Sequence, residues 1–227
     1  MRRFTLVALA LVLAGCGGDE PSAGTATLWV TRDRGRAVLF EGKVPAGLTA
    51  IQALDRKLDI ETRYGGRFVQ AIEGVEADAA KQRDWFWYVN GIEGDRSAAE
   101  YRLHAGDVEW WDYRSWKRQM RVPVVVGAFP EPFLHGYRGR RGVVEVAVDP
   151  QPPHFVEPTL PVVRKLERIV HASDSSARAR YILLIGGNGP FRAHRSNGTI
   201  VFTISARGAG RLADDPSLAK MRFEGLR

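Results

Sequence analysis

Alternating apolar and polar residues mark the first strands of the chain. Residues 26–32 (ATLWVTR) alternate in the manner of a half-buried strand, and residues 37–43 predict the strand that returns beside it. Thr49 suits the N-cap of a helix that ends near residue 57 or 58, because a threonine side chain can accept a hydrogen bond from the first helical turn. Aliphatic residues recur there at three- and four-residue spacing, which gives the helix one apolar face.

Three more strands follow the predicted helix. Residues 68–72 form a short apolar strand, residues 85–89 form a strand closed by Asn90-Gly91, and residues 108–113 follow a Gly-Asp turn. A hairpin, one helix and three further strands is the order expected of a β-grasp, in which a mixed sheet wraps a single helix. We therefore predict an α+β fold whose first domain, residues 26–116, is a β-grasp.

Large aromatic side chains fall on both faces of the last two of these strands. Residues 85–116 contain five of the six tryptophans of the 227-residue chain. Successive residues of a strand face opposite ways. The first strand divides into Trp85, Trp87 and Val89 against Phe86, Tyr88 and Asn90, and the second into Val108, Trp110 and Asp112 against Glu109, Trp111 and Tyr113. Only one face of the sheet can pack on a single helix.

The aromatic face turned away from the helix has three interpretations. Trp87, Tyr88, Trp110 and Trp111 belong to the core and to packing against a second domain, form a platform for a small molecule or glycan, or meet a protein partner. Asn90 is interpreted first as a turn residue, with a hydrogen bond to a ligand as the alternative.

The passage from WFWYVNG through Ser97-Ala98-Ala99-Glu100-Tyr101 to Ala105-Gly106-Asp107-Val108-Glu109-Trp110 resembles the transcobalamin C-terminal-like domain. The resemblance covers about 90 residues and implies a β-grasp of the kind found in bacterial surface lipoproteins. In the animal cobalamin carriers this domain forms one wall of the corrinoid site. By resemblance, Ser97, Ala98 and Tyr101 border the ligand side, and cobalamin or a related corrinoid is the expected ligand.

The N-terminus predicts export and a lipid anchor. Two arginines precede an apolar run at residues 4–14, which is too short to span a bilayer but suits a signal peptide. Leu13-Ala14-Gly15-Cys16 resembles the lipobox of bacterial lipoproteins, which implies cleavage before Cys16 and acylation of its thiol, for example with palmitate. We expect a signal peptide at residues 1–15, a lipidated tether at 16–25 and attachment to the outer face of a bacterial membrane. The alternative is an ordinary signal peptide that ends at a cysteine by chance.

The second half of the chain, residues 117–227, reads as a small basic α+β or α/β domain. Strands are predicted at residues 143–148, 181–185 and 199–205, helices at 162–171 and 216–221, and an edge or strand start at 122–126. Residues 17–116 carry a net charge of −4, whereas residues 117–227 carry +9. This sign change predicts a domain boundary near residues 116–121.

Charge and motif patterns argue against several function classes. The chain carries +7 in total, but its basic residues are scattered rather than clustered in runs, so we do not expect a nucleic-acid partner. Cys16 is the only cysteine, and the five histidines lack metal-ligand spacing, so neither a disulfide nor a metal site is predicted. No catalytic residues are predicted, because a Gly-x-Ser-x-Gly motif is missing and the GGNG at residues 186–189 lacks the lysine of a phosphate-binding loop.

These patterns favour a surface-anchored, non-catalytic lipoprotein. It would bind a small ligand, by resemblance corrinoid-like, on its aromatic face or in an interdomain cleft. A second hypothesis is a structural or interaction module of the cell envelope, with buried aromatics and a basic second domain that contacts an anionic envelope polymer or a transporter partner. An enzyme whose site is not visible in the sequence is the third.

Overall fold

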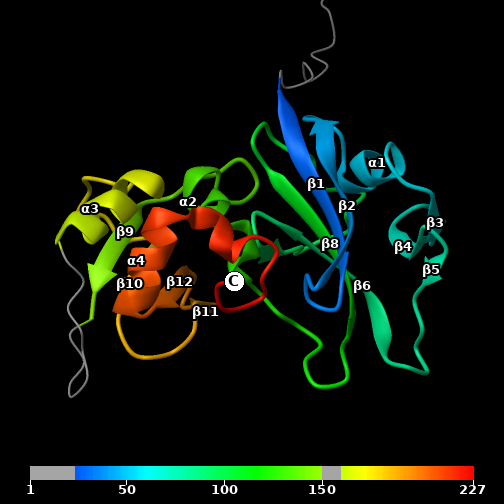
Figure 1. The fold of residues 1–227 in the computed structure, drawn as a ribbon. Coiled ribbons are helices and arrows are strands. Elements are labelled where there is room, and N and C mark those ends of the chain that lie inside the picture. The colour runs from blue at the N-terminus through cyan, green and yellow to red at the C-terminus, as the bar shows by residue number, and fades with distance from the viewer. Residues whose placement is uncertain (1–23, 150–159) are drawn as a thin grey trace, which may run out of the picture.

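A computed structural model describes residues 24–149 and 160–227 and confirms the α+β class. Figure 1 shows two halves side by side, each built on its own sheet, with the C-terminal segment between them. The predicted signal peptide, Cys16 and the start of the tether lie outside the described residues, and so does part of the proline-rich stretch before the second-half helix. Within the described ranges, no helix has both the length and the apolar character needed to cross a membrane.

A five-stranded mixed sheet forms the first half. Its strand order is β2 (Ala37–Pro45), β1 (Thr25–Arg32), β8 (Val108–Ser115), β6 (Arg83–Val89) and β7 (Ile92–Glu93). β1 and β8 pair in parallel at its centre, while β2, β6 and β7 pair antiparallel with their neighbours. The strands predicted around residues 26–32, 37–43, 85–89 and 108–113 are confirmed. Assignment of this half to the β-grasp stays a prediction.

The single predicted helix of this half is confirmed as α1 (Ala50–Asp55). Thr49 is its N-cap: the Thr49 hydroxyl accepts the Gln52 N–H at 3.2 Å, and the Gln52 side-chain carbonyl accepts the Thr49 N–H at 2.9 Å. These reciprocal bonds form a capping box. The helix is shorter than predicted, because Lys57 and Leu58 both donate to the Leu54 carbonyl and so end it in a turn.

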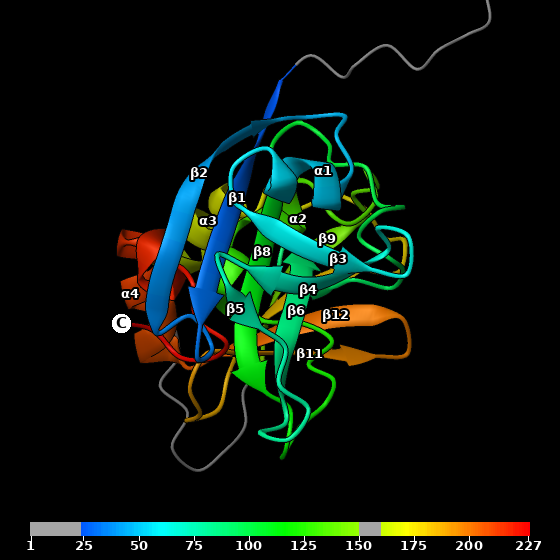
Figure 2. The same ribbon diagram turned by 90° about the vertical axis from the view of Figure 1, so that its right-hand side faces the viewer.

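A small three-stranded sheet lies beside α1 over the same face of the large sheet, as Figure 2 shows. It consists of β3 (Ile60–Arg63), β4 (Phe68–Ile72) and β5 (Val75–Glu76), all antiparallel. Only β4 was predicted. β3 is polar and largely exposed, so its sequence carries no apolar alternation.

The second half contains a four-stranded sheet with two helices. Its strand order is β11 (Arg192–Ser196), β12 (Thr199–Ile204), β10 (Tyr181–Ile185) and β9 (Val144–Val148), and β9, β10 and β12 run parallel. The helix α3 (Leu160–Ile169) lies between β9 and β10 in the chain, which confirms the predicted strand–helix–strand unit. A second helix, α4 (Ala206–Asp214), was not predicted. Its two glycines lower helix propensity and so hid it in the sequence.

Two short elements lie between the sheets in the chain, and a third follows α4. They are the 3-10 helix η1 (Val126–Ala128), α2 (Glu131–Leu134) and the 3-10 helix η2 (Pro216–Ala219). The run at residues 122–126 was predicted to start a strand, but it makes only an isolated bridge from Val124 to Ile92 before η1 begins. The helix predicted at residues 216–221 is shorter in the structure, as the 3-10 helix η2, and the Asp215 side chain caps it by accepting the Ser217 N–H.

Candidate functional site

The predicted alternation of the aromatic strands is confirmed. Trp85 and Trp111 lie in the core on the α1 side of the sheet, whereas Tyr88 and Trp110 lie in a separate core cluster on the opposite side. Both faces of the sheet are therefore covered, one by α1 and the small sheet and the other by segments of the second half.

The face turned away from α1 is closed by residues distant in the chain. Tyr88 and Trp110 are 0% exposed, and the Phe223 ring lies 5.6 Å from the first and 5.3 Å from the second, edge-on to both. Val125 packs in the same cluster. Tyr88 and Trp110 therefore fit the first of the three interpretations: they belong to the core and pack against the second half.

The remaining aromatic candidates form a stacked group on the α1 side. Trp87 stacks on the buried Trp111 with 6.1 Å between ring centroids and meets Tyr101 edge-on at 5.7 Å. Trp87 is half-buried, because Gly94 lies directly against its ring: a Cβ on Gly94 would stand 2.1 Å from a ring carbon. The flat exposed face that a planar corrinoid would need is therefore absent from Tyr88, Trp110 and Trp111.

Asn90 adopts the positive φ expected of a turn residue, at 51°. Its side chain is fully used inside the protein: Nδ2 donates to Asp107 Oδ1 at 2.8 Å and to the Gly136 carbonyl at 2.9 Å, and Oδ1 accepts the Val108 N–H at 2.8 Å. Asn90 therefore ties the first sheet to the loop that enters the second half.

The three residues expected by resemblance lie on one connection, but only one of them faces a hollow. Ser97 donates its hydroxyl to the Arg67 carbonyl at 2.6 Å, and Ala98 is buried. Tyr101 lines a small cavity of about 300 Å³, and its hydroxyl accepts the Arg138 N–H at 2.9 Å. Burial raises the pKa of Tyr101, so its phenol stays protonated at neutral pH.

The structure reveals a second cavity, of about 440 Å³, where the two halves meet. We call it the arginine pocket. Its lining includes the six arginines Arg138, Arg140, Arg141, Arg178, Arg180 and Arg195, together with Tyr137 and a single carboxylate, Asp95. Arg138 also lines the cavity beside Tyr101, so the two hollows adjoin.

The second-half sheet brings these arginines together from three segments. Arg141 precedes β9 and Arg180 directly precedes β10, and because these strands are parallel, their amino ends lie side by side. Arg195 lies on β11, where it pairs with Ile200 at the start of β12, the other parallel neighbour of β10. The pocket is therefore built at the amino ends of the three parallel strands.

Several of the arginines have no internal partner. Arg141 donates to the Phe133 carbonyl at 2.7 Å, and Arg178 donates to the Asn197 carbonyl at 3.0 Å, so these two side chains also hold loops. Within the part of the chain that the structure describes, the side chains of Arg138, Arg140 and Arg195 make neither a hydrogen bond nor an ion pair, and all three are exposed. Like charges held this close repel one another, and an anion between them relieves that repulsion.

The carboxylate and phenol of the pocket are held in defined states. Hydrogen bonding from Arg96 lowers the pKa of Asp95, which keeps this carboxylate ionised. Tyr137 donates its hydroxyl to Asp95 at 2.9 Å, and burial raises the pKa of Tyr137 to about 12. The Asp95 carboxylate is therefore hydrogen-bonded to Arg96 and Tyr137 rather than to an arginine of the pocket.

The sequence contained only part of this signal. The net charge of +9 in residues 117–227 indicated a basic second half, but Arg178, Arg180 and Arg195 come together with the residues of the 138–141 loop only through the parallel strand order. No group of three or more His, Cys, Asp or Glu side chains in residues 24–149 and 160–227 is arranged to hold a metal ion.

Comparisons with known proteins identify one matching family. Residues 47–115 match the model described as "Domain of unknown function (DUF4430)", which spans α1 to β8 and contains Asp95 but none of the pocket arginines. No curated protein matches this chain. Among solved structures, the chain is similar to a protein from Ruminococcus gnavus described as a "putative metal binding protein", with 18% identity over 40% of this chain and 97% of that chain and a TM-score of 0.31.

Proposed function

We propose that this protein is a non-catalytic binding lipoprotein of the bacterial cell envelope, and that its arginine pocket binds an anionic ligand. The pocket lies where the two halves meet, and its chemistry favours phosphate or carboxylate groups. Guanidinium groups present planar, paired donors that match these anions and remain charged at every physiological pH. The tether from Cys16 would hold the pocket at the outer face of a membrane, where anionic polymers and metabolites are encountered.

One observation carries the proposal: six arginines and a single, internally occupied carboxylate surround one cavity. A surface cluster of arginines without nearby acids lowers the stability of the protein, because its like charges repel one another. A bound anion would relieve this repulsion. The 440 Å³ volume is within the range of small-molecule sites and accommodates a few phosphate groups or a short polymer segment.

Calorimetric titration of the purified full-length protein in detergent tests this site, with inorganic tripolyphosphate and a poly(glycerol phosphate) oligomer as probes. We expect saturable binding that weakens as the salt concentration rises. The variants Arg138→Gln, Arg140→Gln and Arg195→Gln should each weaken binding by about tenfold, since each removes a charge-assisted contact. Arg207→Gln on α4, an exposed arginine outside the pocket, is the matched control. Failure of both probes to bind, or equal losses in the control, would refute the anion site.

The anchor is tested separately by the distribution of the protein between membrane and soluble fractions. Cys16→Ser removes the only cysteine, and we expect it to release the protein from membranes while leaving binding of tripolyphosphate unchanged. A variant that remains fully membrane-bound would show that the lipid on Cys16 is not the anchor.

A further inference from the structure

Exposed aromatic rings mark the hairpin of β3 and β4. Tyr64 is 78% exposed and Phe68 is 37% exposed, and their rings meet edge-on with centroids 6.2 Å apart. Tyr64 has a φ of 54° and precedes two glycines that also have positive φ, so a tight turn directs its ring outward. Large exposed aromatics in a soluble protein are a signal of binding rather than of folding.

A hollow of about 280 Å³ lies beside this hairpin. The residues that line it and carry the argument are Tyr64, Phe68, Gln70, Arg83, Asp84 and Trp116. It shares no lining residue with the arginine pocket, and all but one of these six lie within the matched family region at residues 47–115. We call it the aromatic hollow.

Gln70 is placed in the aromatic hollow by an irregularity of β4. The β3–β4 ladder pairs Glu61 with Ala71 and Thr62 with Val69, so Gln70 is an extra residue without a partner in β3, which defines a β-bulge. Gln70 is 9% exposed as a whole residue, and its side-chain amide makes no hydrogen bond within the described parts of the chain, so the amide is open to solvent in the aromatic hollow. The amide is therefore available to a ligand, and a bulge that re-aims one side chain is typical of a binding site.

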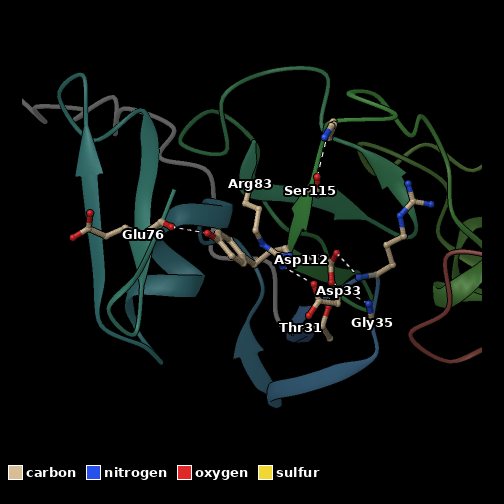
Figure 3. A network of polar contacts seen from close by, with 10 residues as sticks. Thr31, Asp33, Gly35, Glu76, Arg83, Asp112 and Ser115 are labelled. Atoms are coloured by element: carbon tan, nitrogen blue, oxygen red, sulfur yellow. Dashed lines mark hydrogen bonds and ion pairs between the residues drawn. The ribbon is translucent and has the colours of Figure 1, made fainter. Parts of the chain in front are cut away.

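Two charged residues complete the wall opposite the rings. Arg83 is fixed by an ion pair to Asp33 and lies 4.7 Å over the Tyr113 ring, while Tyr113 in turn donates its hydroxyl to the Glu76 carbonyl at 2.9 Å (Figure 3). Asp84 uses one carboxylate oxygen to accept the Trp85 N–H at 2.7 Å, and its second oxygen has no hydrogen bond in the described residues. The arginine is therefore rigid, and the aspartate retains an acceptor for a ligand.

We infer that the aromatic hollow binds a neutral sugar ring, as one unit of an envelope glycan. The C–H face of a pyranose is apolar and packs on aromatic rings such as Tyr64 and Phe68, whose faces carry negative partial charge. Its hydroxyl groups can satisfy both the Gln70 amide and the free oxygen of Asp84. A hydrocarbon would leave Gln70 and Asp84 without partners. The volume accommodates about one ring.

The test uses saturation-transfer NMR and intrinsic fluorescence of the purified full-length protein. The probes are oligomers of glucose, galactose, mannose and N-acetylglucosamine, with tetra-alanine as a peptide probe. We expect saturable binding of at least one sugar oligomer and none of tetra-alanine, with a fluorescence change that disappears in Trp116→Phe. No saturable sugar binding across this panel, or binding of the peptide alone, would overturn the inference.

Variants distinguish the aromatic hollow from other surfaces. Tyr64→Ala and Gln70→Ala should each weaken sugar binding at least fivefold without lowering the thermal midpoint, because neither side chain makes a hydrogen bond in the described structure. Leu39→Ala, a change at another exposed apolar side chain, should have no effect. The triple variant Arg138→Gln, Arg140→Gln and Arg195→Gln should bind sugar normally. Loss of anion binding in the arginine pocket can therefore be distinguished from loss of sugar binding in the aromatic hollow. Equal loss in Leu39→Ala would show that the binding is non-specific.

Discussion

The Thr31 hydroxyl donates a 2.6 Å hydrogen bond to the Asp112 carboxylate while it accepts the indole N–H of Trp110 at 2.8 Å. Asp112 also accepts the backbone N–H groups of Arg34 and Gly35, each at 3.0 Å, so one buried carboxylate organises the β1–β2 turn (Figure 3). The chain from indole to hydroxyl to carboxylate satisfies three polar groups inside an aromatic core, where an unpaired group is costly.

Thr31→Val keeps the shape of the side chain but removes the hydroxyl. The Trp110 N–H would lose its acceptor and Asp112 would lose a donor, so we expect the free energy of unfolding to fall by about 2 kcal/mol. Urea unfolding followed by far-UV circular dichroism measures this. Thr31→Ser retains the hydroxyl and should lose much less, and equal losses in the two variants would contradict the role of the hydrogen bonds.

We expect Glu109 to make the free energy of unfolding depend on pH. Burial raises the pKa of its carboxyl well above 4.5, and although Oε1 accepts the Trp111 indole N–H, Oε2 is buried without a partner. Because the folded-state pKa is raised, the contribution of Glu109 to stability is complete below pH 4.5 and is lost as the pH rises through the folded-state value. Glu109→Gln removes this titration.

The measurement is the difference in free energy of unfolding between Glu109→Gln and the unaltered protein at several pH values. We expect that difference to shift in favour of the variant above pH 4.5, by up to about 1.4 kcal/mol per pH unit. Taking the difference cancels the contributions of the other acids with raised pKa values, Asp84, Glu93, Asp112 and Glu131. Parallel curves for the two proteins would show that Glu109 titrates alike in the folded and unfolded states.

We expect Arg114 to protect the segment at residues 117–121 from proteases. Its guanidinium lies 3.6 Å from the centre of the Phe86 ring and donates to the carbonyls of Gln119 and Met120, each at 2.9 Å. Arg114→Met should lower stability by about 3 kcal/mol and speed tryptic cleavage after Lys117, Arg118 and Arg121. Arg36→Met, at an exposed turn, serves as the control. Unchanged cleavage in Arg114→Met would show that the hydrogen bonds from Arg114 do not protect this segment.

We expect the Phe223 ring to shield Tyr88 and Trp110 from solvent. Phe223→Ala would remove the ring that closes over Tyr88 and Trp110, so we expect a loss of about 3 kcal/mol and stronger quenching of tryptophan fluorescence by acrylamide. Leu160→Ala, at a 60% exposed side chain, should change neither. Quenching that stays at the level of the unaltered protein would mean that other residues shield Trp110.

The local features of the fold were predictable where one short pattern determines them. Thr49 was identified as an N-cap because capping depends on residues three positions apart, and the two faces of the aromatic strands followed from simple alternation. The bulge at Gln70 and the helix at residues 206–214 were missed, because the first has no sequence signature and the second contains two glycines.

The binding surfaces were less predictable, because they depend on contacts between distant segments. Tyr88 and Trp110 looked available for a ligand until Phe223, more than a hundred residues later, was found against them. In the same way, Arg195 joins Arg138 and Arg140 only because β10 and β12 run parallel. Tyr64 was not singled out at all, since a lone tyrosine in a polar turn has no distinguishing pattern.

The segment Met221–Phe223 closes a face of a sheet whose strands were all made much earlier. The Gly127 carbonyl accepts the Met221 N–H at 3.0 Å, and a Cβ at Gly35 would stand 1.9 Å from the Met221 carbonyl oxygen, so this closure is tight. During synthesis, the first sheet therefore emerges before Phe223, and Tyr88 and Trp110 lack the cover of its ring until residue 223 has been added. Throughout that interval the nascent chain presents an aromatic surface that a chaperone would recognise.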